Sequence, residues 1–192
     1  MDSELKFRRS NPERPVAPGG KGSEEEHPFA AYNLTETKEL RLFMGENEMN
    51  RLPAFSGRLT GGCLDCLANL VGTKYDNVEA FNEKYKDEGI VWFLEACDLN
   101  VMSIRRALWN LDRAGWFKYA KGFIIGRPLA AWKQEMMGLD QYNAVTGILG
   151  KYNVPIVMDA DVGHLPPAMP IISGAKADVS CDGSNVTLLY KM

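Results

Sequence analysis

The sequence lacks several features that would place it at once in a common class of proteins. Lysines and arginines number 22 against 25 aspartates and glutamates, which gives a net charge of −3. Because no basic surplus is available for a phosphate backbone, we expect no nucleic-acid partner. No run of about 18 apolar residues occurs, and residues 1–10 contain no apolar signal-peptide core. We therefore expect no membrane partner and a cytoplasmic location.

Cysteine and histidine are also scarce. The 192 residues contain two histidines and four cysteines, Cys63, Cys66, Cys97 and Cys181. Without a secretion signal, these cysteines are predicted to be reduced thiols. A zinc site at Cys63-x-x-Cys66 would need a second pair at matching spacing, which Cys97, Cys181 and His164 do not supply. We favour buried thiols over a thiol or zinc protein, and expect neither a metal nor another cofactor.

The composition that is present, 45% hydrophobic and 24% charged residues, is sufficient for one folded domain. Residues 1–28 differ from the rest because prolines, glycines and glutamates replace apolar residues there. Such a segment cannot offset the entropy of ordering, so we interpret it as a flexible linker or arm. The folded domain is predicted to span residues 29–192. Because an arm of this kind leads out of another folded part, a preceding domain is expected.

Runs and periodicities of apolar residues predict a mixed sheet with flanking helices, an α/β domain. Ile90-Val91-Trp92-Phe93-Leu94 is a continuous apolar run typical of a buried strand. Asn100 is expected to cap an amphipathic helix that ends at Gly115, and Asp182-Gly183 to form a hairpin turn. The predicted strands are 32–43, 55–60, 90–94, 122–126, 154–158, 168–172, 177–181 and 186–190, and the other predicted helices are 63–71, 77–85 and 132–151.

Glu95 is the most unusual charged residue because it directly follows the apolar run 90–94. A carboxylate at the end of a buried strand must be paired, or neutral with a raised pKa. His164 follows another predicted buried strand, in a loop that Gly163 frees and two prolines stiffen. A histidine held in this way can act as a general base. The alternatives are a structural salt bridge or helix cap for Glu95, and an ordinary hydrogen-bonding loop residue for His164.

Glu95 and His164 together form two thirds of a Ser-His-acid triad, in which the acid orients the imidazole and the imidazole takes the serine proton. The serine is missing, because no Gly-x-Ser-x-Gly sequence occurs. His27 lies in the arm and is expected to be inert. Arg58 and Arg127 could each bind a substrate carboxylate, although surface salt bridges are the default interpretation.

Six segments of the sequence, taken in order, resemble the second half of LD-carboxypeptidases, which include muramoyl-tetrapeptide carboxypeptidases and microcin-immunity peptidases. The resemblance runs from about residue 32 to the C-terminus. The segments are Gly57-Arg-Leu-Thr-Gly-Gly-Cys-Leu-Asp, Leu70-Val-Gly-Thr-Lys-Tyr-Asp, Trp92-Phe-Leu-Glu-Ala-Cys, Ala114-Gly-Trp-Phe, Gly122-Phe-Ile-Ile-Gly-Arg-Pro and Asp159-Ala-Asp-Val-Gly-His-Leu-Pro-Pro.

The resemblance implies that the family's catalytic glutamate and histidine fall on Glu95 and His164. It further implies a swivelling β/β/α-type domain and a homodimer. Family members carry the serine in a preceding domain of about 150 residues, a typical domain size. Nothing in this sequence matches that domain, so we expect the chain to be inactive without it.

The complete enzyme would hydrolyse an L,D-amide bond in a murein tetrapeptide during peptidoglycan recycling. Two alternatives stay open. One is a microcin-type peptidase that acts on a peptidyl nucleotide, and the other is a non-catalytic module that only binds the peptide. Because a single domain exposes the surface that its partner would cover, we also expect the chain to associate.

Overall fold

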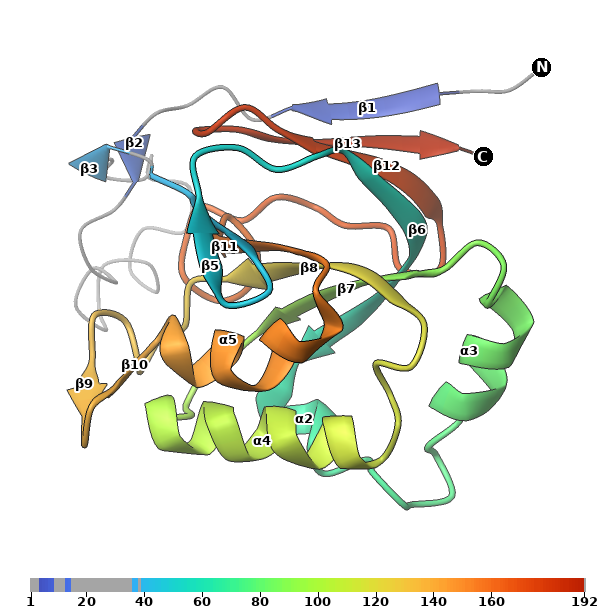
Figure 1. Ribbon diagram of the computed structural model, residues 1–192, viewed down its shortest axis with the longest axis horizontal. Coiled ribbons are helices and arrows are strands. Elements are labelled where there is room, and N and C mark those ends of the chain that lie inside the picture. The colour runs from blue at the N-terminus through green and yellow to red at the C-terminus, as the bar shows by residue number, and fades with distance from the viewer. Residues whose placement is uncertain (1–3, 9–12, 15–35, 38, 192) are drawn as a thin grey trace, which may run out of the picture.

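The computed structural model describes residues 4–8, 13–14, 36–37 and 39–191, and these residues form a nine-stranded mixed sheet (Figure 1). The strand order is β1-β13-β12-β6-β7-β8-β11-β4-β5. The strands are β1 Glu4–Arg8, β4 Arg41–Met44, β5 Asn47–Met49, β6 Phe55–Cys63, β7 Ile90–Glu95, β8 Ala120–Gly126, β11 Pro155–Ala160, β12 Lys176–Cys181 and β13 Val186–Lys191. Two further pairs are short: β2 Glu13–Arg14 with β3 Glu36–Thr37, and β9 Glu135–Met136 with β10 Leu139–Asp140.

The centre of the sheet consists of four parallel strands, β6, β7, β8 and β11. Antiparallel strands flank them on both sides. Parallel strands all end at the same edge, so the residues that end β6, β7, β8 and β11 lie at one edge of the sheet. This edge is where open α/β sheets place their ligands.

The helices gather on one side of the sheet, and β12 and β13 curl over the other side (Figure 1). The helical elements are α2 Leu64–Leu67, α3 Val78–Tyr85, α4 Val101–Arg113, α5 Asn143–Leu149 and the 3₁₀ turn η1 Gly150–Tyr152. Alternate residues of β7 pack into two different cores: Trp92 and Leu94 contact the helices, and Val91 packs with residues of β12 and β13. The continuous apolar run therefore reflects burial on both faces.

The predicted α/β class is confirmed, and so are most of its central elements. The runs at 90–94, 122–126 and 154–158 form β7, β8 and β11, and Asp182-Gly183 joins β12 to β13. Asn100 caps α4, because its side-chain oxygen accepts a hydrogen bond of 2.9 Å from the backbone amide of Ser103.

Two predicted elements are wrong. The helix expected over 132–151 is a hairpin, β9 and β10, followed by α5 and η1. Met137 and Gly138 adopt positive φ angles of 53° and 78°, which turn the chain and end any helix. The strand expected over 168–172 is an irregular segment with no strand pairing. Met169 and Ile171 pack on the core without joining the sheet, because periodicity alone does not supply a hydrogen-bonding neighbour.

The strand expected over 55–60 is longer than predicted, and the helix after it is shorter. β6 passes through Gly61 and Gly62 and ends only at Cys63, which leaves α2 four residues long. Gly61 has φ +148°, and a Cβ there would clash with the backbone of Phe93 on β7. The glycine pair therefore allows β6 and β7 to stay in close contact up to their ends, where Cys63 pairs with Glu95.

Most of the predicted arm, 1–28, lies outside the described residues, as do His27 and residues 32–35 and 38 of the first predicted strand. The described part of that predicted strand, 32–43, contributes to two strands, β3 and β4. Within the arm, β1 pairs with β13 in antiparallel register and extends the sheet. The domain boundary at residue 28 stays a prediction. No helix in the described part of the chain is long and apolar enough to cross a membrane.

Candidate active site

Glu95 ends β7 at the carboxyl edge of the parallel strands, and only 6% of it is exposed. Two glycines make room for its side chain. A Cβ at Gly163 would lie 2.6 Å from both Cγ and Oε2 of Glu95, and one at Gly126 would lie 3.0 Å from the Cβ of Glu95. Gly163 also has φ +105°, a conformation that favours glycine. The absence of a Cβ at the two glycines thus leaves space for the buried Glu95 side chain at this edge of the sheet.

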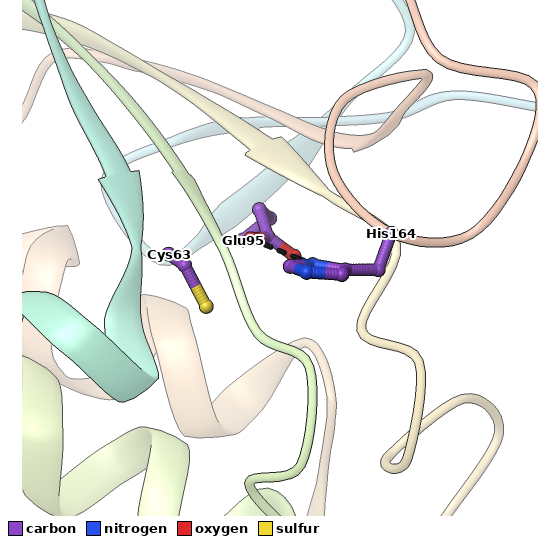
Figure 2. Close-up of side chains that lie close together, drawn as sticks. All are labelled: Cys63, Glu95 and His164. Carbon is purple, nitrogen blue, oxygen red and sulfur yellow. Dashed lines mark hydrogen bonds and ion pairs between the residues drawn. The ribbon is translucent and has the colours of Figure 1, made fainter.

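His164 lies in the loop after β11, and its ring reaches the carboxylate of Glu95 (Figure 2). Its Nδ1 is 3.0 Å from Oε1 and 2.9 Å from Oε2. The predicted contact between the two residues is confirmed. Because an ionised carboxylate only accepts hydrogen bonds, Nδ1 donates to it and Nε2 is left to take a proton from a ligand. Half of the His164 side chain, 50%, is exposed, so a ligand can reach it.

The surroundings of His164 favour its charged form. The hydrogen bond to Glu95 raises the pKa of His164 above its usual value, and the negative charges of Glu95, Asp65 and Asp98 act in the same direction. Partial burial opposes this effect but is smaller than the hydrogen bond. A carboxylate that orients an imidazole and stabilises its imidazolium is what a Ser-His-acid triad requires of its acid.

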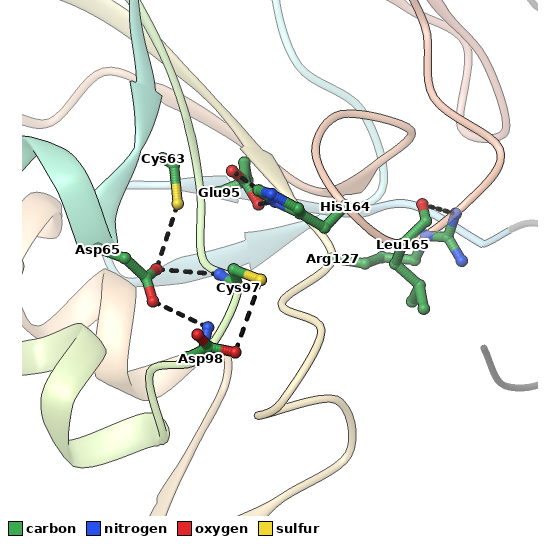
Figure 3. A network of polar contacts seen from close by, with 8 residues as sticks. All are labelled: Cys63, Asp65, Glu95, Cys97, Asp98, Arg127, His164 and Leu165. Atoms are coloured by element: carbon green, nitrogen blue, oxygen red, sulfur yellow. Dashed lines mark hydrogen bonds and ion pairs between the residues drawn. The ribbon is translucent and has the colours of Figure 1, made fainter. Parts of the chain in front are cut away.

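Arg127 supports the loop that carries His164 (Figure 3). Its Nη2 donates to Asp161 Oδ1 at 3.2 Å and to the carbonyl oxygens of Leu165 and Pro166 at 3.2 and 3.0 Å. The side chains of Arg127 and Asp161 are only 1% and 3% exposed. Arg127 is therefore an internal brace. The expected salt bridge forms, but it is buried and not at the surface, and the burial of the guanidinium argues against the interpretation as a ligand for a substrate.

Arg58 lies away from the site. It pairs with Glu88 at 2.8 Å, which confirms the salt-bridge interpretation. In the register of β6 and β7, Arg58 lies opposite Ile90 at the start of β7, whereas Cys63 lies opposite Glu95 at its end. Arg58 thus cannot contact a ligand bound at His164.

The side chain that β6 brings beside the pair is the thiol of Cys63. Its Sγ donates to Asp65 Oδ2 at 3.3 Å, and Asp65 accepts hydrogen bonds from the backbone amides of Cys97 and Asp98 at 2.9 and 2.8 Å (Figure 3). Burial, and next the hydrogen bond to Glu95, raise the pKa of Cys63 to about 12. The thiol stays protonated near neutral pH, so it is a poor nucleophile. This argues against a Cys-His nucleophile at the site.

Cys63, Cys66 and Cys97 are free thiols, but the prediction that the pair Cys63 and Cys66 is buried is wrong. Cys66 is exposed, and Cys63, Cys97 and Cys181 are only half-buried. Cys66 faces solvent because α2 is a single short turn and not the longer amphipathic helix that was expected.

The proximity of Cys63 to Glu95 and His164 was not predicted from the sequence. One donor atom from each of the three side chains lies within 4.8 Å of the others. If the strand predicted over 55–60 had been continued through Gly61 and Gly62, Cys63 and Glu95 would each have ended a predicted strand. Their contact could then have been inferred from the sequence. The spacing of cysteines alone suggested Cys66 as the partner of Cys63.

The sequence matches known proteins over most of the described sheet. Residues 56–179 match the family model of the LD-carboxypeptidase C-terminal domain. A protein of Streptomyces coelicolor that bears the name of a carboxypeptidase is 29% identical over 136 residues. That alignment covers 69% of this chain and 39% of the Streptomyces protein.

Solved structures share the fold. Muramoyltetrapeptide carboxypeptidase from Oxalobacter formigenes superposes with a TM-score of 0.59 at 19% identity, over 88% of this chain and 53% of that protein. An MccF-like protein from Streptococcus pneumoniae, solved with AMP, gives 0.65 at 21% identity, over 95% and 52%. The microcin C7 self-immunity protein gives 0.69 at 16% identity, over 95% and 49%. The predicted fold is confirmed, and the chain spans about half of each of these structures.

Proposed function

The chain belongs to the LD-carboxypeptidase family, of which it contains the C-terminal domain, and from that premise we propose that it supplies the acid and the base of a serine-type peptidase. Glu95 is the proposed acid and His164 the proposed base. The observation that carries the proposal is the pair of contacts, 2.9 and 3.0 Å, between Nδ1 of His164 and the buried carboxylate.

The proposed reaction follows from this geometry. A serine hydroxyl attacks the carbonyl carbon of the scissile amide, and Nε2 of His164 takes the hydroxyl proton. Glu95 holds Nδ1 and stabilises the imidazolium that forms. Nε2 then gives the proton to the leaving amine, and water releases the acyl group by the same route. The serine is proposed to come from a separate domain, consistent with relatives about twice the length of this chain.

The proposed substrate is a murein tetrapeptide, cut at the amide bond between an L- and a D-amino acid, as part of peptidoglycan recycling in the cytoplasm. One relative by fold is a muramoyltetrapeptide carboxypeptidase, which supports this choice. The microcin C7 immunity protein has been solved with aspartyl sulfamoyl adenosine, so an aminoacyl nucleotide is the second substrate to test. A homodimer is proposed for the complete enzyme.

The test joins this chain to the part of the Streptomyces relative that the alignment does not cover, and measures release of the terminal D-amino acid from the tetrapeptide. We expect cleavage, and we expect His164→Ala to reduce kcat/KM by about 10²–10⁴-fold, the usual contribution of a general acid–base residue. Glu95→Gln should reduce it as well, since glutamine does not stabilise the imidazolium.

Glu88→Gln is the matched control for Glu95→Gln, because Glu88 lies beyond the opposite end of β7 and pairs with Arg58. It should retain full activity. Cleavage that survives His164→Ala would refute the proposal. Tight binding of the tetrapeptide without turnover in the fused protein would instead identify a peptide-binding module.

A further inference from the structure

Three side chains at the edge of the sheet present different donor atoms to one another (Figure 2). They are the thiol of Cys63 at the end of β6, the carboxylate of Glu95 at the end of β7, and the imidazole of His164 in the loop after β11. Their donor atoms lie within 4.8 Å of one another. Sulfur, nitrogen and carboxylate oxygen are the ligands that zinc takes in proteins, commonly as three protein ligands and one open position.

We propose that Cys63, Glu95 and His164 bind a Zn²⁺ ion, and that this ion blocks the acid–base pair. Zinc bonds of about 2.3 Å to sulfur and about 2.0–2.1 Å to nitrogen, in tetrahedral geometry, place two ligand atoms about 3.5 Å apart. The three atoms, which lie within 4.8 Å of one another, reach that spacing if the Glu95–His164 contact opens slightly and any longer separation closes to about 3.5 Å. The half-exposed ring of His164 leaves the fourth position open to water or a ligand.

The charges around the cluster favour a cation. The carboxylate of Asp65 lies next to the thiol of Cys63 and is fixed by the backbone amides of Cys97 and Asp98. It therefore stands where a group behind the metal ligands would orient the sulfur. Asp98 adds a second negative charge that acts on His164. Binding would release the proton of the thiol to solvent and leave the neutral imidazole with its one proton on Nε2, because the sulfur and Nδ1 must both be free of hydrogen to bind zinc.

The consequence for catalysis rests on the proposed function. A zinc ion would occupy Nδ1 of His164 and the carboxylate of Glu95 at once. The imidazole would lose the acid that orients it, and Nε2 would carry the ring's only proton, so it would have no lone pair with which to take the proton of a serine hydroxyl. The metal would therefore inhibit hydrolysis. The binding site itself does not depend on whether the protein is a peptidase.

The decisive experiment measures metal binding by the 192-residue chain, with no peptide substrate present. Zinc is titrated in competition with a chromophoric chelator. We expect one equivalent of Zn²⁺ per chain, and we expect Cys63→Ser to weaken the affinity on the order of 100-fold, at the upper end of the loss seen when even an outer partner of a metal ligand is removed. Cys66→Ser is the matched control and should bind zinc as the unsubstituted chain does, since Cys66 is exposed and lies outside the cluster.

A second measurement separates a lost ligand from a lost fold. Co²⁺ in the same site should give a thiolate-to-cobalt charge-transfer absorption that Cys63→Ser abolishes and Cys66→Ser retains. Zinc should also raise the Tm of the unsubstituted chain and of Cys66→Ser but not that of Cys63→Ser, because a ligand that binds only the folded state stabilises it.

Two results would overturn the proposal. One is an unsubstituted chain that binds zinc no more tightly than Cys63→Ser does. The other is a loss of binding in Cys66→Ser equal to that in Cys63→Ser, which would place the metal between the two cysteines. Neither result bears on peptide cleavage, so the peptidase proposal would stand or fall separately.

Discussion

Two charge pairs hold the same loop, yet their surroundings differ sharply. Arg127 and Asp161 are 1% and 3% exposed, whereas His164 is 50% exposed above a carboxylate that is 6% exposed. Arg127 also donates from Nη2 to two carbonyl oxygens of the loop, so its charge is satisfied by groups inside the protein and not by solvent. The His164 ring has one nitrogen on Glu95 and one side towards solvent.

The comparison shows that one charge pair of the loop is suited to structural support and the other to proton transfer. A fully buried pair tolerates no loss of a partner, because the charge left behind cannot be solvated. It can hold the loop but cannot exchange protons with a ligand. A half-exposed imidazole over a buried acid can do so, since its pKa is set from one side and its proton is accessible from the other.

The largest loss of stability is expected when the buried cation of the Arg127–Asp161 pair is removed. Arg127→Met would leave the carboxylate of Asp161 buried without its guanidinium, and we expect the free energy of unfolding to fall by about 3–5 kcal/mol. Urea denaturation measures this. Arg41→Met serves as the control, because Arg41 and Glu48 form an exposed pair and its loss should cost about 1 kcal/mol or less. Equal losses in the two variants would contradict the distinction.

A smaller effect is expected from filling the space beside Glu95. Gly163→Ala would place a Cβ 2.6 Å from the Glu95 carboxylate at a φ of +105°. We expect a loss of about 1–3 kcal/mol in the free energy of unfolding, from strain and overpacking. The Glu95–His164 hydrogen bond should break, which NMR of the imidazole would report.

Gly174→Ala is the control for this substitution. Gly174 also has a positive φ, +82°, but a Cβ there would meet nothing within 4 Å. It should therefore lose less stability than Gly163→Ala and leave the His164 signals unchanged. A larger loss for Gly174→Ala would show that backbone strain, and not the space around Glu95, sets the cost.

The smallest expected effect on stability, and the most specific, concerns the titration of His164. In Glu95→Gln the pKa of His164 should fall towards its ordinary value, because the hydrogen bond to Glu95 is the first cause of the raised pKa. NMR titration of the imidazole measures this. Asp98→Asn should lower the pKa less, since its charge is the weakest of the named contributions. An unchanged pKa of His164 in Glu95→Gln would contradict the proposal that Glu95 raises it.

The raised pKa of His164 determines how its contribution to the unfolding free energy changes with pH. Protonation of His164 stabilises the folded state fully below the ordinary histidine pKa of about 6.5, and this contribution is lost as the pH rises through the raised folded pKa. The difference in unfolding free energy between the unsubstituted chain and Glu95→Gln should therefore be larger at about pH 6 than at about pH 9.

Continuous apolar runs and capping residues predicted the centre of the fold. The segments 90–94, 123–125 and 156–158 of β7, β8 and β11 pack on both faces of the sheet, so their residues are apolar, and that pattern is visible in the sequence alone. Segments outside these central strands were harder to predict. The hairpin β9–β10 and the unpaired segment 168–172 depend on local φ angles and on which strand lies alongside, neither of which periodicity encodes.

The sequence by itself determined that Glu95 would end a buried strand and that His164 would lie in a glycine–proline loop, because burial and backbone freedom are local consequences of residue type. Only the tertiary structure decided which other residues lie beside Glu95 and His164. Parallel pairing of β6 with β7 carried Cys63 to the carboxylate, and burial made Arg127 a brace for the loop. Contacts between residues distant in the chain arise from strand order and register, which depend on how all the strands pack together.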